Sequence, residues 1–202
     1  MSIELSQLKA IMPSAGSRAD NYFDALNAAM EACEINTPIR IAMFLANIAH
    51  ESAQLLYMAE IWGPNQVPVQ KTYANRMGNN KPEALALVPP GVDPGKYFRG
   101  YGPIQVTGYD NQIEIATYFG IAPADMVAWL QTPEGGCKAS AYYWQKNGLN
   151  ELADKENYDH VAVEFDAVCD MINLGHRTAR LGDTNGWRDR LEYYERAKRV
   201  LL

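Results

Sequence analysis

The chain has 202 residues, of which 48% are hydrophobic, so it is long enough to bury the core of one domain. Its formal net charge is −6 and its isoelectric point is about 5.1. Nucleic acid requires a basic binding surface, so this charge argues against nucleic acid as the main partner. No apolar run reaches the roughly 18 residues that a membrane span requires, and we expect no stable membrane insertion.

Apolar residues recur at helical spacing through most of the chain, which predicts a mainly α fold. The predicted helices span Glu4–Ile11, Ser17–Glu34, Thr37–Leu56, Pro82–Val88, Gln112–Phe119, Ala124–Leu130, Gly135–Asn147, His160–Ile172 and Trp187–Leu202. The irregular stretch from Trp62 to Gly102 is typical of a functional loop region in a compact domain. We expect a single domain over residues 1–202, with two lobes around a central cleft and at most a short hairpin near it.

The helix predicted over Thr37–Leu56 carries Glu51 near its end. Asn36 or Thr37 can cap this helix, Pro38 suits its first turn, and the remaining positions are very apolar. Burial in such a helix would raise the pKa of the Glu51 carboxyl and favour a proton donor. The alternative for a single helical glutamate is a solvated charge on the polar face.

A second carboxylate, Glu60, follows nine positions later. At 100° per residue, one straight helix would point Glu51 and Glu60 in opposite directions. If the two act together, the helix must end before Glu60, and Glu60 must lie on the segment that follows. The sequence Gly63-Pro64-Asn65 indicates that regular structure breaks up nearby.

The stretch from Tyr97 to Asn111 combines aromatic residues, one cation, three glycines and several polar side chains. Its glycines allow a positive φ or a close approach of the backbone to another group. Gln105, Thr107 and Asn111 carry the donors and acceptors that hold hydroxyl-rich ligands or a water molecule. A glycine-rich surface turn is the alternative interpretation.

The cysteines and histidines do not form the pattern of a metal site. Cys33, Cys137 and Cys169 are scattered, so we expect buried thiols rather than a disulfide framework, and folding in a reducing cytoplasm. The chain start lacks the apolar segment of a signal peptide. We expect His50 to be a hydrogen-bonding partner near Glu51 or a core residue.

Four motifs together resemble the family-19 glycoside hydrolases, the plant-type chitinases and their phage and bacterial lysozyme-like relatives. They are His50-Glu51-Ser52, Glu60, the stretch from Arg99 to Thr107, and Met171-Ile172-Asn173. The blocks at 138–154 and 185–197 also resemble late regions of that family. The similarity runs from about residue 36 to the C-terminus and is strongest to compact, single-domain phage endolysins, which have a lysozyme-like helical fold.

The resemblance implies a role for each matching residue. Glu51 would be the general acid, Glu60 the base that activates a water, and Thr107 a residue that helps to hold this water. Inversion at the anomeric carbon is implied, with the carboxyl groups roughly 6.5–9.5 Å apart. The sugar-binding residues would be Gln105, Asn111, Asn173, Tyr73, Arg99, Tyr101 and Arg190, although core packing is an equally good interpretation for Tyr73. Tyr101 departs from the Arg-Gly-Arg-Gly pattern that the family often shows, and a tyrosine there favours stacking on a sugar over contact with a charge. Arg190 resembles the family's C-terminal arginine and would point inward.

An inverting, endo-acting hydrolase of β-1,4 bonds in an N-acetylated amino-sugar polymer is therefore expected. Peptidoglycan is the favoured substrate, with chitin as the alternative, and no cofactor is implied. For a phage endolysin, the resemblance implies a monomer that accumulates in the host cytoplasm and reaches the cell wall through a holin lesion, without a separate wall-binding domain. A lytic transglycosylase, a zinc amidase and a non-catalytic sugar-binding module are rival hypotheses.

Overall fold

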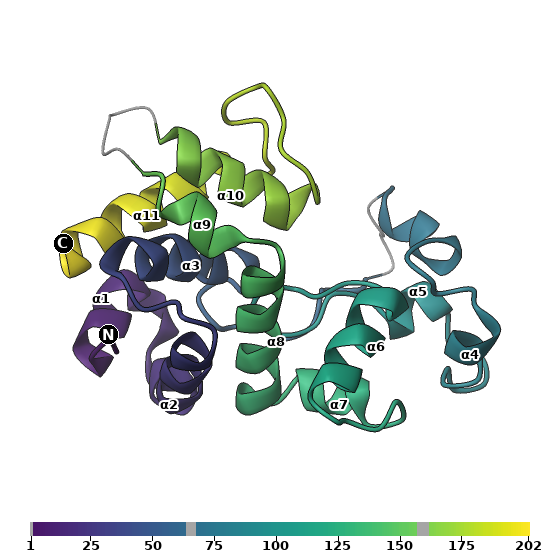
Figure 1. The fold of residues 1–202 in the computed structure, drawn as a ribbon. Helices are drawn as coiled ribbons and strands as arrows, with labels where there is room; N and C mark the ends of the chain where they lie inside the picture. Colours follow the sequence, from purple (N-terminus) through teal and green to yellow (C-terminus); the bar gives the residue numbers. More distant parts are fainter. Residues whose placement is uncertain (1, 64–67, 157–161) are drawn as a thin grey trace. The chain divides into compact units, whose positions relative to one another are not determined.

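The computed structural model describes residues 2–63, 68–156 and 162–202. Its elements are α1 (Leu5–Ile11), η1 (Pro13–Ala15), α2 (Ser17–Ala32), α3 (Pro38–Glu51), η2 (Gln70–Asn75), α4 (Pro82–Leu85), α5 (Pro94–Tyr97), α6 (Tyr109–Tyr118), α7 (Met126–Leu130), α8 (Pro133–Lys146), α9 (Leu149–Ala153), α10 (Val163–Asn173) and α11 (Trp187–Leu201) (Figure 1). Isolated bridges join Tyr101 to Ala59 and to Val106. The predicted mainly α fold with little extended structure is confirmed.

Several element boundaries differ from the prediction. Helix α3, which carries the candidate catalytic residue, ends at Glu51, five residues before the predicted end at Leu56. The short helices α5 and α9 were not among the predicted elements. The predicted helix start at His160 and the Pro64-Asn65 break lie outside the described residues. Within the described ranges, we find no helix with both the length and the apolar character needed to cross a membrane.

The chain forms two compact units. The first unit contains the chain up to Leu56 together with Ala141–Leu202, and the second unit contains Tyr57–Ser140. In the first unit, every side chain of α3 from Ile41 to Ala49 is buried. A helix that is apolar all round belongs in a core, and α9, α10 and α11 all pack against α3 (Figure 1).

Aromatic and amide contacts fix the first unit around α3. The ring of Phe44 meets that of Trp144 edge to face, with centroids 5.4 Å apart. The indole nitrogen of Trp144 donates to Asn150 at 2.9 Å, and the Asn150 amide donates to the carbonyl of Cys33 at the same distance. The buried polar groups are thereby paired, and they hold Trp144 and Asn150 to the rest of the first unit.

A left-handed turn follows directly after α3. Residues 53–55 have φ between 47° and 64°, although none of them is glycine. Residues with a Cβ avoid this conformation at a cost of about 1–2 kcal/mol each. The Gln54 side chain accepts from the amide of Ser14 and donates to the hydroxyl of Tyr193, each at 2.8 Å. These contacts within the first unit hold the turn and explain why α3 ends early.

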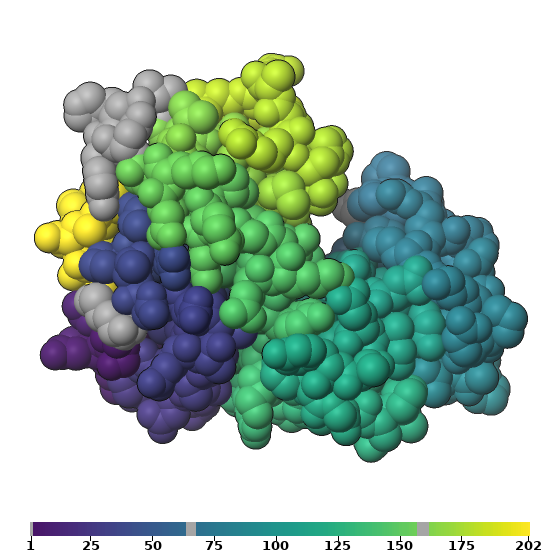
Figure 2. Space-filling view, viewed as in Figure 1, coloured from purple at the N-terminus to yellow at the C-terminus, as the bar shows by residue number. Residues whose placement is uncertain are grey.

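The segment between α10 and α11, residues 174–186, is held to α10 by two buried aspartates. Asp170 accepts from the amide of Thr178 at 2.8 Å, and Asp166 accepts from the amide of Gly182 at 2.8 Å. The yellow-green atoms in Figure 2 show this segment at the surface. The buried carboxylates are therefore the anchors of an exposed connection.

The stability of Asp166→Asn relative to the wild type should increase as the pH rises. Burial raises the pKa of Asp166 because the ionised form loses its hydration. A raised folded-state pKa gives stability below the unfolded value of about 3.9, and this stability is lost as the pH rises through the folded value. Thermal midpoints of variant and wild type at about pH 3 and about pH 7 measure the change.

Asp154→Asn is the matched control with the opposite sign. The Arg40 guanidinium, which Asp154 binds at 2.8 Å, lowers the pKa of that carboxyl. The wild type therefore gains stability from Asp154 at neutral pH and loses it in acid. The stability of Asp154→Asn relative to the wild type should decrease as the pH rises. A midpoint difference for Asp166→Asn that does not change with pH would refute the expectation.

Candidate active site

Glu51 is the last residue of α3 and its carboxylate contacts the guanidinium of Arg190 on α11. The Arg190 side chain is 1% exposed, and it also donates to Asn47 at 2.7 Å and to the carbonyl of Asn185 at 3.0 Å. A buried guanidinium is stable only when its donors are paired, and here three acceptors share it. Arg190 points inward as predicted. Glu51 has a cation beside it, which the apolar pattern of its own helix did not indicate.

Glu60 lies in the second unit, directly after the bridge residue Ala59. Its amide donates to the carbonyl of Gly100 at 2.8 Å. One carboxylate oxygen accepts from the side chain of Gln70 at 2.7 Å, and the other accepts from the Gly100 amide at 3.2 Å. Glu60 therefore follows the end of the helix, as the phase argument required, and both of its oxygens are held.

The loop between α5 and α6 is organised by Gln112, which is fully buried on α6. Its amide nitrogen donates to the carbonyls of Phe98, Arg99 and Val106 at 2.9–3.3 Å. One side chain therefore fixes both ends of the loop. The sequence analysis missed Gln112 and Gln70, because an isolated glutamine carries no pattern that indicates which backbone it will bind.

Thr107 and Gln105 lie close to the backbone of Gly100, which also binds Glu60. A Cβ at Gly100 would come within 2.8 Å of the Gln105 carboxamide oxygen and 3.2 Å of the Thr107 hydroxyl oxygen. Only glycine fits this position without displacing them. The structure thus brings together three predicted site residues, Glu60, Gln105 and Thr107, around one backbone position.

The polar groups of this cluster are oriented by local hydrogen bonds. The Thr107 hydroxyl donates to the carbonyl of Gln105 at 2.9 Å, and Gln105 has a φ of 59°. The side-chain amide of Gln105 donates to the carbonyl of Gly102 at 2.9 Å. Asn111 is exposed on α6 and donates to the carbonyl of Thr107 at 2.9 Å. Asn111 therefore borders the cluster and supports Thr107 through its backbone.

The prediction that Tyr101 stacks on a sugar is wrong. Tyr101 is 2% exposed, and its hydroxyl donates to the carbonyl of Tyr97 at 2.9 Å. Burial raises the pKa of this phenol. The guanidinium of Arg99 lies 5.0 Å from the centre of the Tyr101 ring and donates to the carbonyl of Lys96. Arg99 and Tyr101 therefore pack against each other and shape the loop.

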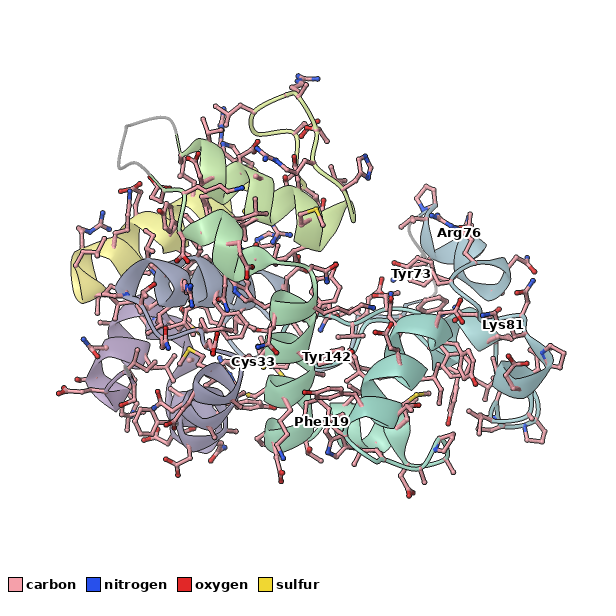
Figure 3. All side chains as sticks on the ribbon, viewed as in Figure 1. Cys33, Tyr73, Arg76, Lys81, Phe119 and Tyr142 are labelled. Atoms are coloured by element: carbon pink, nitrogen blue, oxygen red, sulfur yellow. The ribbon has the colours of Figure 1, made fainter. Side chains whose placement is uncertain are left out.

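Tyr73 and Asn173 lie in different units. Tyr73 comes from η2, as labelled in Figure 3, and its half-buried ring lies 6.0 Å from that of Trp62. Asn173 is exposed at the end of α10, and its side-chain oxygen accepts from the amide of Asn185 at 3.1 Å. The chain turns at Gly175, which has a φ of 78°. The sugar-binding roles of both residues stay predictions.

Cys33, Cys137 and Cys169 are free, buried thiols. Burial raises the pKa of each, so these groups are poor nucleophiles at neutral pH. Among the residues with a described position, no group of three or more His, Cys, Asp or Glu side chains is arranged to hold a metal ion. Glu51 and Glu60 stay the predicted catalytic carboxylates.

No family model matches the sequence. A protein from Haemophilus influenzae, described as a glycosyl hydrolase family 19 domain-containing protein, is 26% identical over 161 residues, or 66% of this chain and 75% of that protein. Chitinase C from Streptomyces griseus HUT6037 has a TM-score of 0.67 at 20% identity, covering 98% of this chain and 76% of its own. The class IV family GH19 chitinase from Zea mays has a TM-score of 0.55 at 18% identity, covering 99% and 82%.

These likenesses agree with the sequence motifs. The two solved structures show that the chain has the chitinase fold, and the curated relative carries the same family description that the motifs indicate. The more specific likeness to phage endolysins stays a prediction. The chain therefore has the fold of these chitinases and is similar in sequence to a family 19 protein.

Proposed function

We propose that this protein is an inverting, endo-acting hydrolase of β-1,4 bonds in a polymer of N-acetylated amino sugars. The observation that carries the proposal is the paired state of Glu51, whose carboxylate contacts the buried guanidinium of Arg190. In the proposed reaction, the protonated form of Glu51 gives its proton to the glycosidic oxygen, and the carboxylate paired with Arg190 is the state that this transfer produces. A fixed cation favours this developing negative charge in a site of low dielectric, so Arg190 promotes the transfer.

Glu60 is the proposed base that takes a proton from the attacking water. Its two oxygens accept from Gln70 and from the Gly100 amide, and these bonds fix the direction of the carboxylate. The Thr107 hydroxyl lies against the same glycine and can hold the water by hydrogen bonding. Inversion requires a water between substrate and base, and the carboxyl groups of such enzymes are roughly 6.5–9.5 Å apart.

Peptidoglycan is the proposed substrate, with chitin as the second candidate. The free, buried thiols support folding in a reducing cytoplasm, which agrees with a lysis enzyme that reaches the cell wall through a holin lesion and acts as a monomer. The names of the similar solved structures support chitin instead, because both proteins are described as chitinases.

Mass spectrometry of the products released from purified Gram-negative peptidoglycan tests the proposal, with chitin oligomers treated in parallel. Reducing muropeptide ends would support hydrolysis of the wall. Anhydro-sugar ends would identify a lytic transglycosylase and refute the role of Glu60 as a base. Cleavage of chitin alone would assign a chitinase, and cleavage of neither polymer would refute the proposed function.

Glu60→Gln should lower kcat by about 10²–10⁴-fold, the usual contribution of a general base. Thr107→Ala should have a smaller effect, because the water keeps its contact with Glu60. Glutamine at position 60 has a single acceptor oxygen, so it keeps only one of the contacts from Gln70 and Gly100, and circular dichroism verifies that the variant folds. Rates on the cleaved polymer measure both variants, with Glu83→Gln on the short helix α4 as the control. Equal rates for Glu60→Gln and the wild type would remove Glu60 from the mechanism.

A further inference from the structure

The end of α3 and the start of α11 are joined by two adjacent polar links. His50 precedes Glu51 on α3, and Asp189 precedes Arg190 on α11. The Nδ1 atom of His50 lies 2.6 Å from a carboxylate oxygen of Asp189, beside the contact between Glu51 and Arg190. On α3 the histidine comes before the acidic residue, whereas on α11 the acidic residue comes before the arginine. His50 therefore lies opposite Asp189, and Glu51 lies opposite Arg190.

The backbone of α11 is shaped to accept the His50 ring. Gly186 is the residue before α11 and has a left-handed φ of 73°. A Cβ at Gly186 would come within 2.1 Å of Cε1 of His50, so any side chain there would displace the imidazole. The ring therefore lies directly against the first turn of α11, while Asp189 in the same turn holds its nitrogen.

We propose that the His50–Asp189 pair is a positioning pair that holds the first turn of α11 so that Arg190 meets Glu51. The inference rests on the proposed function of Glu51 as the general acid. Asp189 favours the N-terminal turn of α11, because a carboxylate complements the dipole at that end of the helix, and it also holds the His50 ring at the end of α3. The pair thus stabilises the two helix ends that carry Glu51 and Arg190.

Asp189→Ala and Asp189→Asn separate positioning from charge. Both remove the same negative charge, but asparagine keeps an oxygen that accepts a hydrogen bond from His50. The side chain of Asp189 is 52% exposed, so neither change opens the core. We expect Asp189→Ala to lower kcat by about 10- to 100-fold with an unchanged KM, because small displacements of a catalytic group have effects of this size. Asp189→Asn should keep most of the wild-type kcat.

The pH profile of kcat gives a readout that a merely structural role would not move. Because Glu51 is the proposed acid, loss of its contact with Arg190 should change the pH profile of Asp189→Ala relative to the wild type. The profile of Asp189→Asn should match that of the wild type. Asp154→Asn, which removes the partner of Arg40 at the other end of α3, is the matched control and should leave kcat and the profile unchanged.

The outcomes are distinct. If the wild type cleaves its polymer and Asp189→Ala matches it in kcat and in pH profile, the positioning inference is overturned while the proposed function stands. Equal losses in Asp189→Ala and Asp189→Asn would also overturn it, because charge alone would then explain the effect. If Asp189→Ala does not fold, His50→Gln, which changes the other member of the pair, is compared with the wild type in kcat and pH profile instead. A wild type without glycan cleavage refutes the proposed function, and the inference with it.

Discussion

Glu51→Gln removes nearly all glycan cleavage, with an expected loss in kcat of about 10²–10⁴-fold. Glutamine has almost the shape of glutamate and its carbonyl can still accept from Arg190, but it has no acidic proton for the leaving oxygen. Product release over time, together with circular dichroism to verify folding, measures the effect. We expect a lower thermal midpoint, because Arg190 loses its ionic partner.

Glu192→Gln is the matched control for this experiment. Glu192 also binds an arginine, Arg196, but its side chain is 68% exposed and the pair lies on the surface of α11. Loss of an exposed pair has little effect on stability and none on the proposed chemistry. A Glu51→Gln variant with the turnover of this control would exclude Glu51 as the acid.

Arg190→Leu should destabilise the protein by about 3–5 kcal/mol, because it breaks a buried ion pair and leaves the other partner without compensation. Three acceptors, on Asn47, Glu51 and Asn185, lose their donor at once. For a chain of this size the thermal midpoint should fall by about 6–20 °C. Scanning calorimetry measures the shift.

Arg190→Lys should have an intermediate midpoint. Lysine keeps the charge, but its single ammonium lacks the planar fork that reaches three acceptors together. Arg196→Leu, which removes an exposed guanidinium from the same helix, should shift the midpoint only slightly. An Arg190→Leu variant that unfolds at the wild-type temperature would show that the buried pair contributes no stability.

The helical core and the placement of Glu60 could be predicted from the sequence. The apolar pattern of α3 is strong enough to identify a buried helix, and the angle per residue places Glu60 beyond its end. The early end of α3 could not be predicted, because the left-handed turn at 53–55 contains no glycine. Its conformation depends on Gln54 contacts to Ser14 and Tyr193, which are distant in the sequence.

Most of the side-chain contacts in the candidate site could not be predicted from the sequence. The His50–Asp189 and Glu51–Arg190 contacts each join residues 139 positions apart, and no local periodicity contains that information. Tyr101 was wrongly predicted to be available to a sugar, because a tyrosine in a glycine-rich stretch has the same composition whether its ring is exposed or buried. Family resemblance identified Arg190 as inward-facing, but not the buried Asn47 that it also binds.

The first unit combines the beginning of the chain with its last helix, and this has a consequence during translation. A ribosome releases α3 early, then the whole of Tyr57–Ser140, and only afterwards α11 with Arg190. Domains fold as their residues emerge, so the second unit can fold while Glu51 still has no guanidinium beside it. A nascent chain that has not yet exposed α11 therefore lacks the guanidinium that contacts Glu51, and the proposed acid is complete only when α11 has been synthesised.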